Sequence, residues 1–209
     1  MKMLTAARPL VVLVVMAAAI LPLPGYGASS PTELRSSTGS CGVQRWSIKT
    51  GTDSQARRVS YHPIVTSIAH LTSLSSPSYL PPRRRIRPAE MKTWLLSATL
   101  LRYKLEDDSD YHLVIRDGAG RTMIVELPYP GCVGSRSPFL RGIKRARRTF
   151  EGRYRVLRHF RYTHKSIQIV GVGFFDDIHG QSGVAPNGIE LHPVLGLSFG
   201  RRPPAPPFR

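Results

Sequence analysis

The alternation of apolar and polar residues predicts mostly β-strands in the second half of the chain. Apolar residues, many of them β-branched or aromatic, dominate one side of five runs: 91–105, 111–116, 121–127, 166–175 and 189–199. The second and third runs are separated by Asp117-Gly118-Ala119-Gly120, a turn signal between two β-rich segments. We therefore expect five strands, of which the second and third form a hairpin.

One amphipathic helix is predicted between the third and fourth strands. Ser137 is a preferred N-cap residue, and Pro138 would occupy the first helical position. The apolar residues that follow share one helical face: Phe139, Ile143, Ala146 and Phe150. Four cations fall on the opposite face: Arg141, Lys144, Arg145 and Arg148. The outer stripe of this helix is therefore expected to be basic.

The order of three strands, one helix and two strands is that of an OB-fold, a five-stranded, partly open Greek-key barrel. We expect a mainly β domain over residues 89–199, an OB-fold-like five-stranded barrel with one amphipathic helix between strands 3 and 4. OB-folds often bind oligonucleotides or oligosaccharides. Another small α+β sheet is the alternative architecture.

A secretory signal peptide is predicted over residues 1–27. Lys2 and Arg8 precede an apolar run at 9–23, and Gly25-x-Gly27 supplies the small residues that a signal peptidase requires, so cleavage is expected near Gly27/Ala28. The alternative is an uncleaved anchor, which needs about 20 apolar residues to cross a bilayer. We expect a secreted or extracytoplasmic protein with no transmembrane segment in the mature chain.

Three further segments are predicted from composition: a flexible lead-in at 28–40, an N-terminal extension with a basic linker at 41–88, and a Pro-rich tail at 200–209. Within the extension, residues 46–49 resemble a short strand and residues 64–74 a helix. The linker ends in an arginine run at 83–87, which we expect to be solvated.

The chain contains two cysteines, Cys41 and Cys132. An exported chain meets an oxidising compartment, so a disulfide between them is expected. The alternative is two free, buried thiols. No Cys-x-x-Cys or Cys/His spacing indicates a zinc site.

The charge balance predicts an anionic partner. The chain has 30 Lys and Arg against 13 Asp and Glu, a formal net charge of +17 at pH 7. Such a charge attracts polyanions without selecting among them, so nucleic acid, an acidic glycan or wall polymer, and an anionic surface are all candidate partners.

The basic residues concentrate between positions 136 and 165, and aromatic residues are interleaved with them, among them Phe150, Tyr154, Phe160 and Tyr162. Arginines that contact phosphates and aromatics that stack on bases are typical of single-stranded nucleic-acid binding. The candidate ligand-binding residues are Arg141, Lys144, Arg145, Arg148, Arg153, Arg155 and Arg158. The alternative is a solubilising face whose aromatic residues belong to the core.

Two clusters of acidic residues and histidines are candidate catalytic or metal-binding groups. Asp110 and His112 lie two residues apart, as do Glu190 and His192, so each pair shares one strand face. The candidate residues are Asp108, Asp110, His112, His179, Glu190 and His192. We expect no cofactor, although these side chains could hold a divalent cation or act as acid and base. The alternative is that they only brace turns.

The stretch from Val172 to Val194 resembles a signature of exported bacterial proteins of unknown function. It includes Gly173-Phe174-Phe175-Asp176, then His179-Gly180-Gln181, and then Gly183-Val184-Ala185-Pro186-Asn187-Gly188-Ile189-Glu190-Leu191-His192-Pro193. This resemblance implies export and no particular activity.

A second resemblance is to the staphylococcal nuclease family, whose members are OB-folds that hold a catalytic calcium at an Asp-Gly-Asp-Thr turn. Asp108-Ser109-Asp110-Tyr111 lies in a similar place before a hairpin and a helix. The family's Asp-Thr-Pro-Glu is missing, since the corresponding residues 127–130 read Leu-Pro-Tyr-Pro. Its strand arginine is also unmatched, since residues 122–126 read Thr-Met-Ile-Val-Glu.

Three functions follow from the sequence. The first is an exported OB-like module that binds a polyanion through the basic helix and the connection after it. The second is a metal-assisted phosphodiesterase or similar hydrolase that uses the acidic residues and histidines. The third is a structural envelope protein without catalysis.

Overall fold

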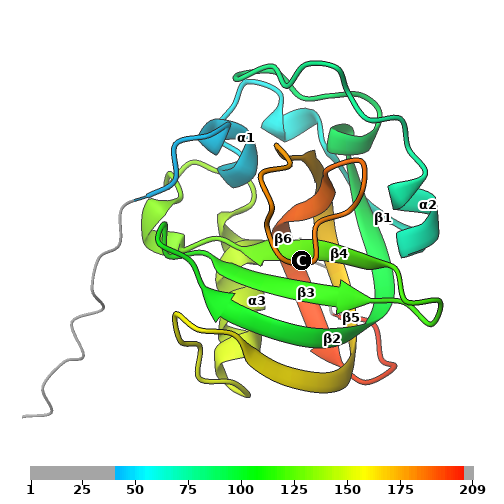
Figure 1. Cartoon of the computed structure of the whole chain (residues 1–209). Helices are drawn as coiled ribbons and strands as arrows, with labels where there is room; N and C mark the ends of the chain where they lie inside the picture. Colours follow the sequence, from blue (N-terminus) through cyan, green and yellow to red (C-terminus); the bar gives the residue numbers. More distant parts are fainter. Residues whose placement is uncertain (1–40, 205–209) are drawn as a thin grey trace, which may run out of the picture. The chain divides into compact units, whose positions relative to one another are not determined.

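The computed structural model describes residues 41–204, and the strands form a single mixed sheet (Figure 1). Six strands are present in the described part of the chain: β1 (Ser60–Val65), β2 (Lys92–Leu105), β3 (Tyr111–Arg116), β4 (Thr122–Leu127), β5 (Arg161–Phe175) and β6 (Ile189–Phe199). Their order is β1-β2-β3-β4-β6-β5, and an additional β2–β5 pairing joins five of them into a ring. The prediction of a mainly β domain is confirmed.

The five predicted strands are β2 to β6. β2, β3 and β4 are consecutive antiparallel neighbours, β4 pairs with β6 in parallel, and β5 is antiparallel to both β6 and β2. β1 was not predicted and pairs in parallel with β2. It extends the sheet at one edge.

The predicted helix is α3 (Leu140–Glu151), which lies between β4 and β5 and packs against β6 (Figure 1). The helix begins two residues later than predicted, with Phe139 and not Ser137 at the N-cap position. The predicted apolar residues are fully buried: Phe139, Ile143, Ala146 and Phe150. Gly142 faces Leu195, whose Cβ would lie 3.1 Å from a Cβ added at Gly142, so the small residue permits close packing. On the outer side, Arg141, Lys144 and Arg148 are exposed. The predicted amphipathic division is confirmed.

Apolar side chains from all five ring strands form the main core. Representative buried members are Leu96, Leu113, Val125, Ile169 and Leu191. They occupy alternate positions along their strands, which is why the sequence pattern predicted them.

The N-terminal segment differs from its prediction. Residues 46–49, expected as a strand, belong to the short helix α1 (Trp46–Thr50). Gly51, at φ 70°, ends this helix and donates its N–H to the Ile48 carbonyl. Glycine adopts the left-handed conformation readily and so ends helices well. The Gly51 cap and tertiary contacts therefore override the weak preference of residues 46–49 for a strand.

The helix expected at 64–74 is also shorter than predicted. Residues 60–65 form β1, and only Ile68–Thr72 form helix α2. Pro63 and the β-branched Ile64 and Val65 favour extended backbone. Ser67 then caps α2 by accepting a hydrogen bond from the His70 N–H.

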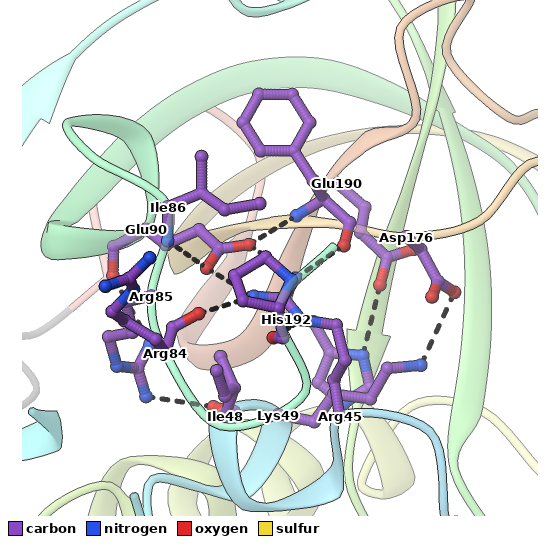
Figure 2. Close-up of polar contacts among 12 residues, drawn as sticks. Arg45, Ile48, Lys49, Arg84, Arg85, Ile86, Glu90, Asp176, Glu190 and His192 are labelled. Atoms are coloured by element: carbon purple, nitrogen blue, oxygen red, sulfur yellow. Dashed lines mark hydrogen bonds and ion pairs between the residues drawn. The ribbon is translucent and has the colours of Figure 1, made fainter. Parts of the chain in front are cut away.

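Two buried ion pairs hold the N-terminal segment: one joins Arg45 to Glu90 in the turn before β2 (Figure 2), and the other joins Arg85 to Asp53 within the segment. Glu90 accepts two hydrogen bonds from Arg45 and one from the Phe175 N–H at the end of β5. Arg85 pairs with Asp53 at 2.6 Å and is only 3% exposed. Arg85 therefore departs from the solvated arginine run expected at 83–87, because Asp53 and the Ile48 carbonyl bind its guanidinium.

A disulfide joins Cys41 and Cys132, as predicted, with a Cα–Cα distance of 5.6 Å. It ties the N-terminal segment to the 3₁₀ turn η3 (Pro130–Cys132) after β4. Within residues 41–204, no helix has the length and apolar character needed to cross a bilayer. The predicted signal peptide and lead-in lie outside the described residues.

Candidate functional site

A cleft of about 750 Å³ opens at one end of the ring. It is lined by residues 41–44 near α1, residues 106–108 between β2 and β3, and residues 179–182 between β5 and β6. Figure 1 shows α1 and the β5–β6 connection at the same end of the ring. Six carboxylate side chains but only two lysines line the cleft, so its interior is acidic although the chain as a whole is basic.

Asp110, Glu126 and His192 converge beneath this cleft. Their candidate ligand atoms all lie within 4.8 Å of one another, and all three residues are buried. His192 Nδ1 lies 3.1 Å from Glu126 Oε2, and His192 Nε2 lies 3.4 Å from Asp110 Oδ2. We call these three residues the buried triad.

The sheet topology assembles the buried triad. Asp110 immediately precedes β3, and Glu126 lies on β4. The parallel pairing of β4 with β6 places Val125 beside Leu191, so the next residues, Glu126 and His192, are also neighbours. The β3–β4 hairpin and the turn before it thus contribute two of the side chains, and the distant strand β6 contributes the third.

Two further side chains flank the buried triad. Glu190 Oε1 lies 3.2 Å from His192 Nδ1 (Figure 2). His112 Nδ1 lies 3.1 Å from Glu126 Oε1, and its Nε2 lies 3.0 Å from the Ser182 carbonyl. Because both nitrogens of His112 face acceptors, the protonated imidazolium fits this position best.

The turn before β3 holds Asp110 in place. Asp110 Oδ1 accepts a hydrogen bond from the Tyr129 N–H, and the Asp110 N–H donates to Asp108 Oδ1. Ser109 between them has a φ of 71°, which is unfavourable for a residue with a side chain. The buried Arg147 of α3 donates from Nη1 to the carbonyls of Ser109 and Leu127. The helix therefore braces this turn.

Hydrogen bonds and neighbouring charges shift the pKa values of Glu126 and His192 in opposite directions. Burial favours a raised pKa for Glu126, but hydrogen bonds from His112 and His192 hold that pKa well below its usual value. Burial favours a lowered pKa for His192, but the carboxylates of Asp110, Glu126 and Glu190 raise it well above its usual value. An ionised Glu126 beside a cationic imidazole is the favoured state when no cation is bound.

Three other groups that line the cleft are also perturbed. Burial and the neighbouring Glu126 raise the pKa of Glu190 to about 7. Burial and Asp110 raise the pKa of Asp108 to about 6. Burial works to lower the pKa of Lys49, but Glu190, Glu126 and other carboxylates raise it above its usual value. The cleft thus holds two carboxyl groups that can exchange protons near neutral pH, and Lys49 beside them stays positively charged.

Two buried polar atoms of the triad lack hydrogen-bond partners. Asp110 Oδ2 and His192 Nε2 lie at ion-pair distance from each other but without hydrogen-bond geometry. Buried polar atoms are normally satisfied, and those left over call for an explanation such as a bound ion. Two carboxylates and one imidazole are a donor set that suits Mn²⁺ or Zn²⁺. The residues present therefore fit a divalent cation.

The structure groups five of the six predicted acidic and histidine candidates. Asp110 and His192 belong to the buried triad, and Asp108, His112 and Glu190 lie beside it. His179 is different, because it lies exposed on the rim of the cleft.

The sequence prediction missed Glu126, Lys49 and Arg147. Glu126 is the one acidic residue in an apolar strand and pairs with His112 across the hairpin, so an alignment of the two strands would have indicated it. Nothing in the sequence around Arg147 distinguishes this cation from the many others in the chain.

The predicted ligand-binding cations lie outside the cleft. On α3, Arg145 is half-buried, whereas Arg141, Lys144 and Arg148 are exposed. The exposed Arg153, Arg155 and Arg158 follow in the connection to β5. Arg158 is paired with Asp107 at the cleft rim, at 2.5 Å.

Comparisons with known proteins leave the site as the main guide to function. No protein-family model matches the chain, and no curated protein is significantly similar to it.

Proposed function

We propose that this protein is an exported, divalent-cation-dependent phosphodiesterase that cleaves an anionic polymer. The observation that carries the proposal is the buried triad, whose three ligand atoms converge within 4.8 Å beneath an open cleft. A cation at this position would supply Lewis-acid stabilisation of charge on a phosphoryl group.

The charge of the cleft supports a role for a cation. Its six carboxylates outnumber its two lysines, so an anionic substrate would be repelled from the cleft of the cation-free protein. A bound divalent cation reverses the local balance and makes the same cleft attractive to a phosphodiester.

The residues around the buried triad have assignable roles. Glu190, with its pKa near 7, is positioned to accept a proton from an attacking water. Asp108, with a pKa near 6, is the candidate acid that protonates the leaving oxygen. Lys49 remains charged and stabilises negative charge that develops in the cleft.

The topology also supports binding of a polymer. The ring order, with a parallel pairing between its third and fifth strands and a helix between its third and fourth, is consistent with the OB-like barrel that we infer. OB-folds bind oligomers on the face of their second and third strands, between the first and last connecting loops. Here those loops are residues 106–110 and 176–188, which border the cleft.

Cleavage of single-stranded DNA tests the proposal, with Mn²⁺, Zn²⁺, Mg²⁺ or Ca²⁺ and with EDTA. Asp110→Asn and His192→Gln should each abolish cleavage and the metal-induced rise in melting temperature. The matched controls are Asp117→Asn, in the β3–β4 turn, and His62→Gln, exposed on β1. Both control variants should keep the cleavage activity and the metal-induced rise in melting temperature. No cleavage with any metal, together with no rise in melting temperature, would overturn the proposal.

A further inference from the structure

We infer that the surface beside the cleft binds single-stranded nucleic acid, by stacking its bases on Phe160 and Tyr162. The inference rests on the proposed function, since it names the polymer that the cleft would cleave. The surface comprises Arg102 and Lys104 on β2 together with these two aromatic residues, and we call it the aromatic platform.

The structure divides the four aromatic residues named above, Phe150, Tyr154, Phe160 and Tyr162, into two groups. Phe150 is fully buried, and Tyr154 packs against the main core. Tyr162 is 72% exposed, which makes it one of the few exposed large apolar residues in the described chain. Phe160 is half-buried, so of the second group Tyr162 is the ring that is most available to a ligand.

The aromatic platform is continuous with the cleft. The ring of Phe160 lies 5.8 Å from that of His112, centroid to centroid, and Lys104, which lines the cleft, lies 5.1 Å from the Phe160 centroid. The Arg102 guanidinium lies 4.8 Å from the Phe160 ring and 6.0 Å from the Tyr162 ring. Figure 1 shows the start of β5 alongside the end of β2, where this surface lies.

The platform combines planar groups with positive charge. Every base has a π-face, so aromatic rings and guanidinium planes bind single strands without reading their sequence. Arg102 donates from Nη2 to Ser182 Oγ, which holds its guanidinium beside the Phe160 ring.

A single strand fits this surface better than a duplex or a glycan. Bases in a duplex are paired and stacked, so their faces cannot reach Tyr162. An acidic glycan offers charge to the cations but has no planar base to stack. Removal of the Tyr162 ring should therefore weaken binding of a single strand selectively.

The test is fluorescence anisotropy of a labelled thymidine oligomer with the full chain in EDTA, beside heparin binding. Tyr162→Ala should weaken oligomer binding about 5-fold or more, which is the lower end for loss of one stacked base, and leave heparin binding unchanged. Tyr162→Trp should restore it. The matched control is Tyr79→Ala, because Tyr79 is equally exposed but lies near Asp176 and Asp177.

Two results would overturn the inference: unchanged oligomer binding in Tyr162→Ala, or an equal loss of oligomer and heparin binding, which would indicate a purely electrostatic surface. Because the assay contains EDTA, it is independent of the buried triad. Selective oligomer binding without cleavage would support the aromatic platform and reject the phosphodiesterase. Cleavage without selective oligomer binding would support the phosphodiesterase and reject the aromatic platform.

Discussion

Arg147 should be a positioning residue whose loss destabilises both the fold and the cation site. It is 5% exposed, and its Nη1 donates to the Ser109 and Leu127 carbonyls while its guanidinium lies 3.6 Å from the Tyr111 ring centroid. Arg147→Ala leaves two carbonyls without this donor, at about 1 to 3 kcal/mol each, and removes a cation–π contact. The bond to the half-exposed Glu151 adds little. We expect a loss of about 3 to 5 kcal/mol.

Urea denaturation followed by circular dichroism measures this loss. Arg148→Ala is the matched control, since the neighbouring exposed arginine should change stability by less than about 0.5 kcal/mol. Arg147→Lys, which keeps the charge but not the planar geometry, should lose less stability yet still weaken Mn²⁺ binding, because Ser109 adjoins Asp110. Equal destabilisation by Arg147→Ala and Arg148→Ala, or full Mn²⁺ affinity in Arg147→Lys, would refute the reasoning.

Three further predictions concern the disulfide, the buried triad and the buried ion pair. The Cys41–Cys132 bridge spans 91 positions, so replacing both cysteines with Ser should cost about 3 to 5 kcal/mol in urea, and the denatured, unreduced protein should titrate no thiol. A cation must displace the proton that the raised pKa keeps on His192, so calorimetric Mn²⁺ affinity should increase from about pH 6 to about pH 8.5; constant affinity would argue against His192 as a ligand. Glu90→Gln should cost about 3 to 5 kcal/mol, because it leaves the buried Arg45 unpaired, and a loss below about 1 kcal/mol would contradict this.

The elements that could be predicted are those in which local pattern and tertiary burial agree. The buried apolar residues of α3 repeat with the helical period, whereas β4 and β6 are buried on both faces and form short, nearly continuous apolar runs that are typical of buried strands. Residues 46–50 are different, because their helix depends on the Gly51 cap and on contacts with distant residues. Such elements carry little local signal.

The sequence predicted those site residues whose grouping depends on local spacing, and it missed Glu126, whose grouping depends on strand pairing. Pairs two residues apart on a strand reveal that Asp110 and His112, or Glu190 and His192, share a face. The position of Glu126 depends instead on the hairpin register. Gly120, at φ 88°, makes the loop three residues long and pairs Glu126 with His112, whereas a two-residue turn would have placed Val125 there.

The parallel pairing of β4 with β6 has a consequence for folding kinetics. Glu126 and His192 come together only when the last strand docks, so an unfolded or partly folded chain has no assembled cation site. Contacts between residues so distant in sequence form late and slowly. A cation that binds only after this step cannot accelerate folding, but it stabilises the native state relative to the transition state. Bound Mn²⁺ should therefore act on the unfolding rate, and lengthen the lifetime of the native protein.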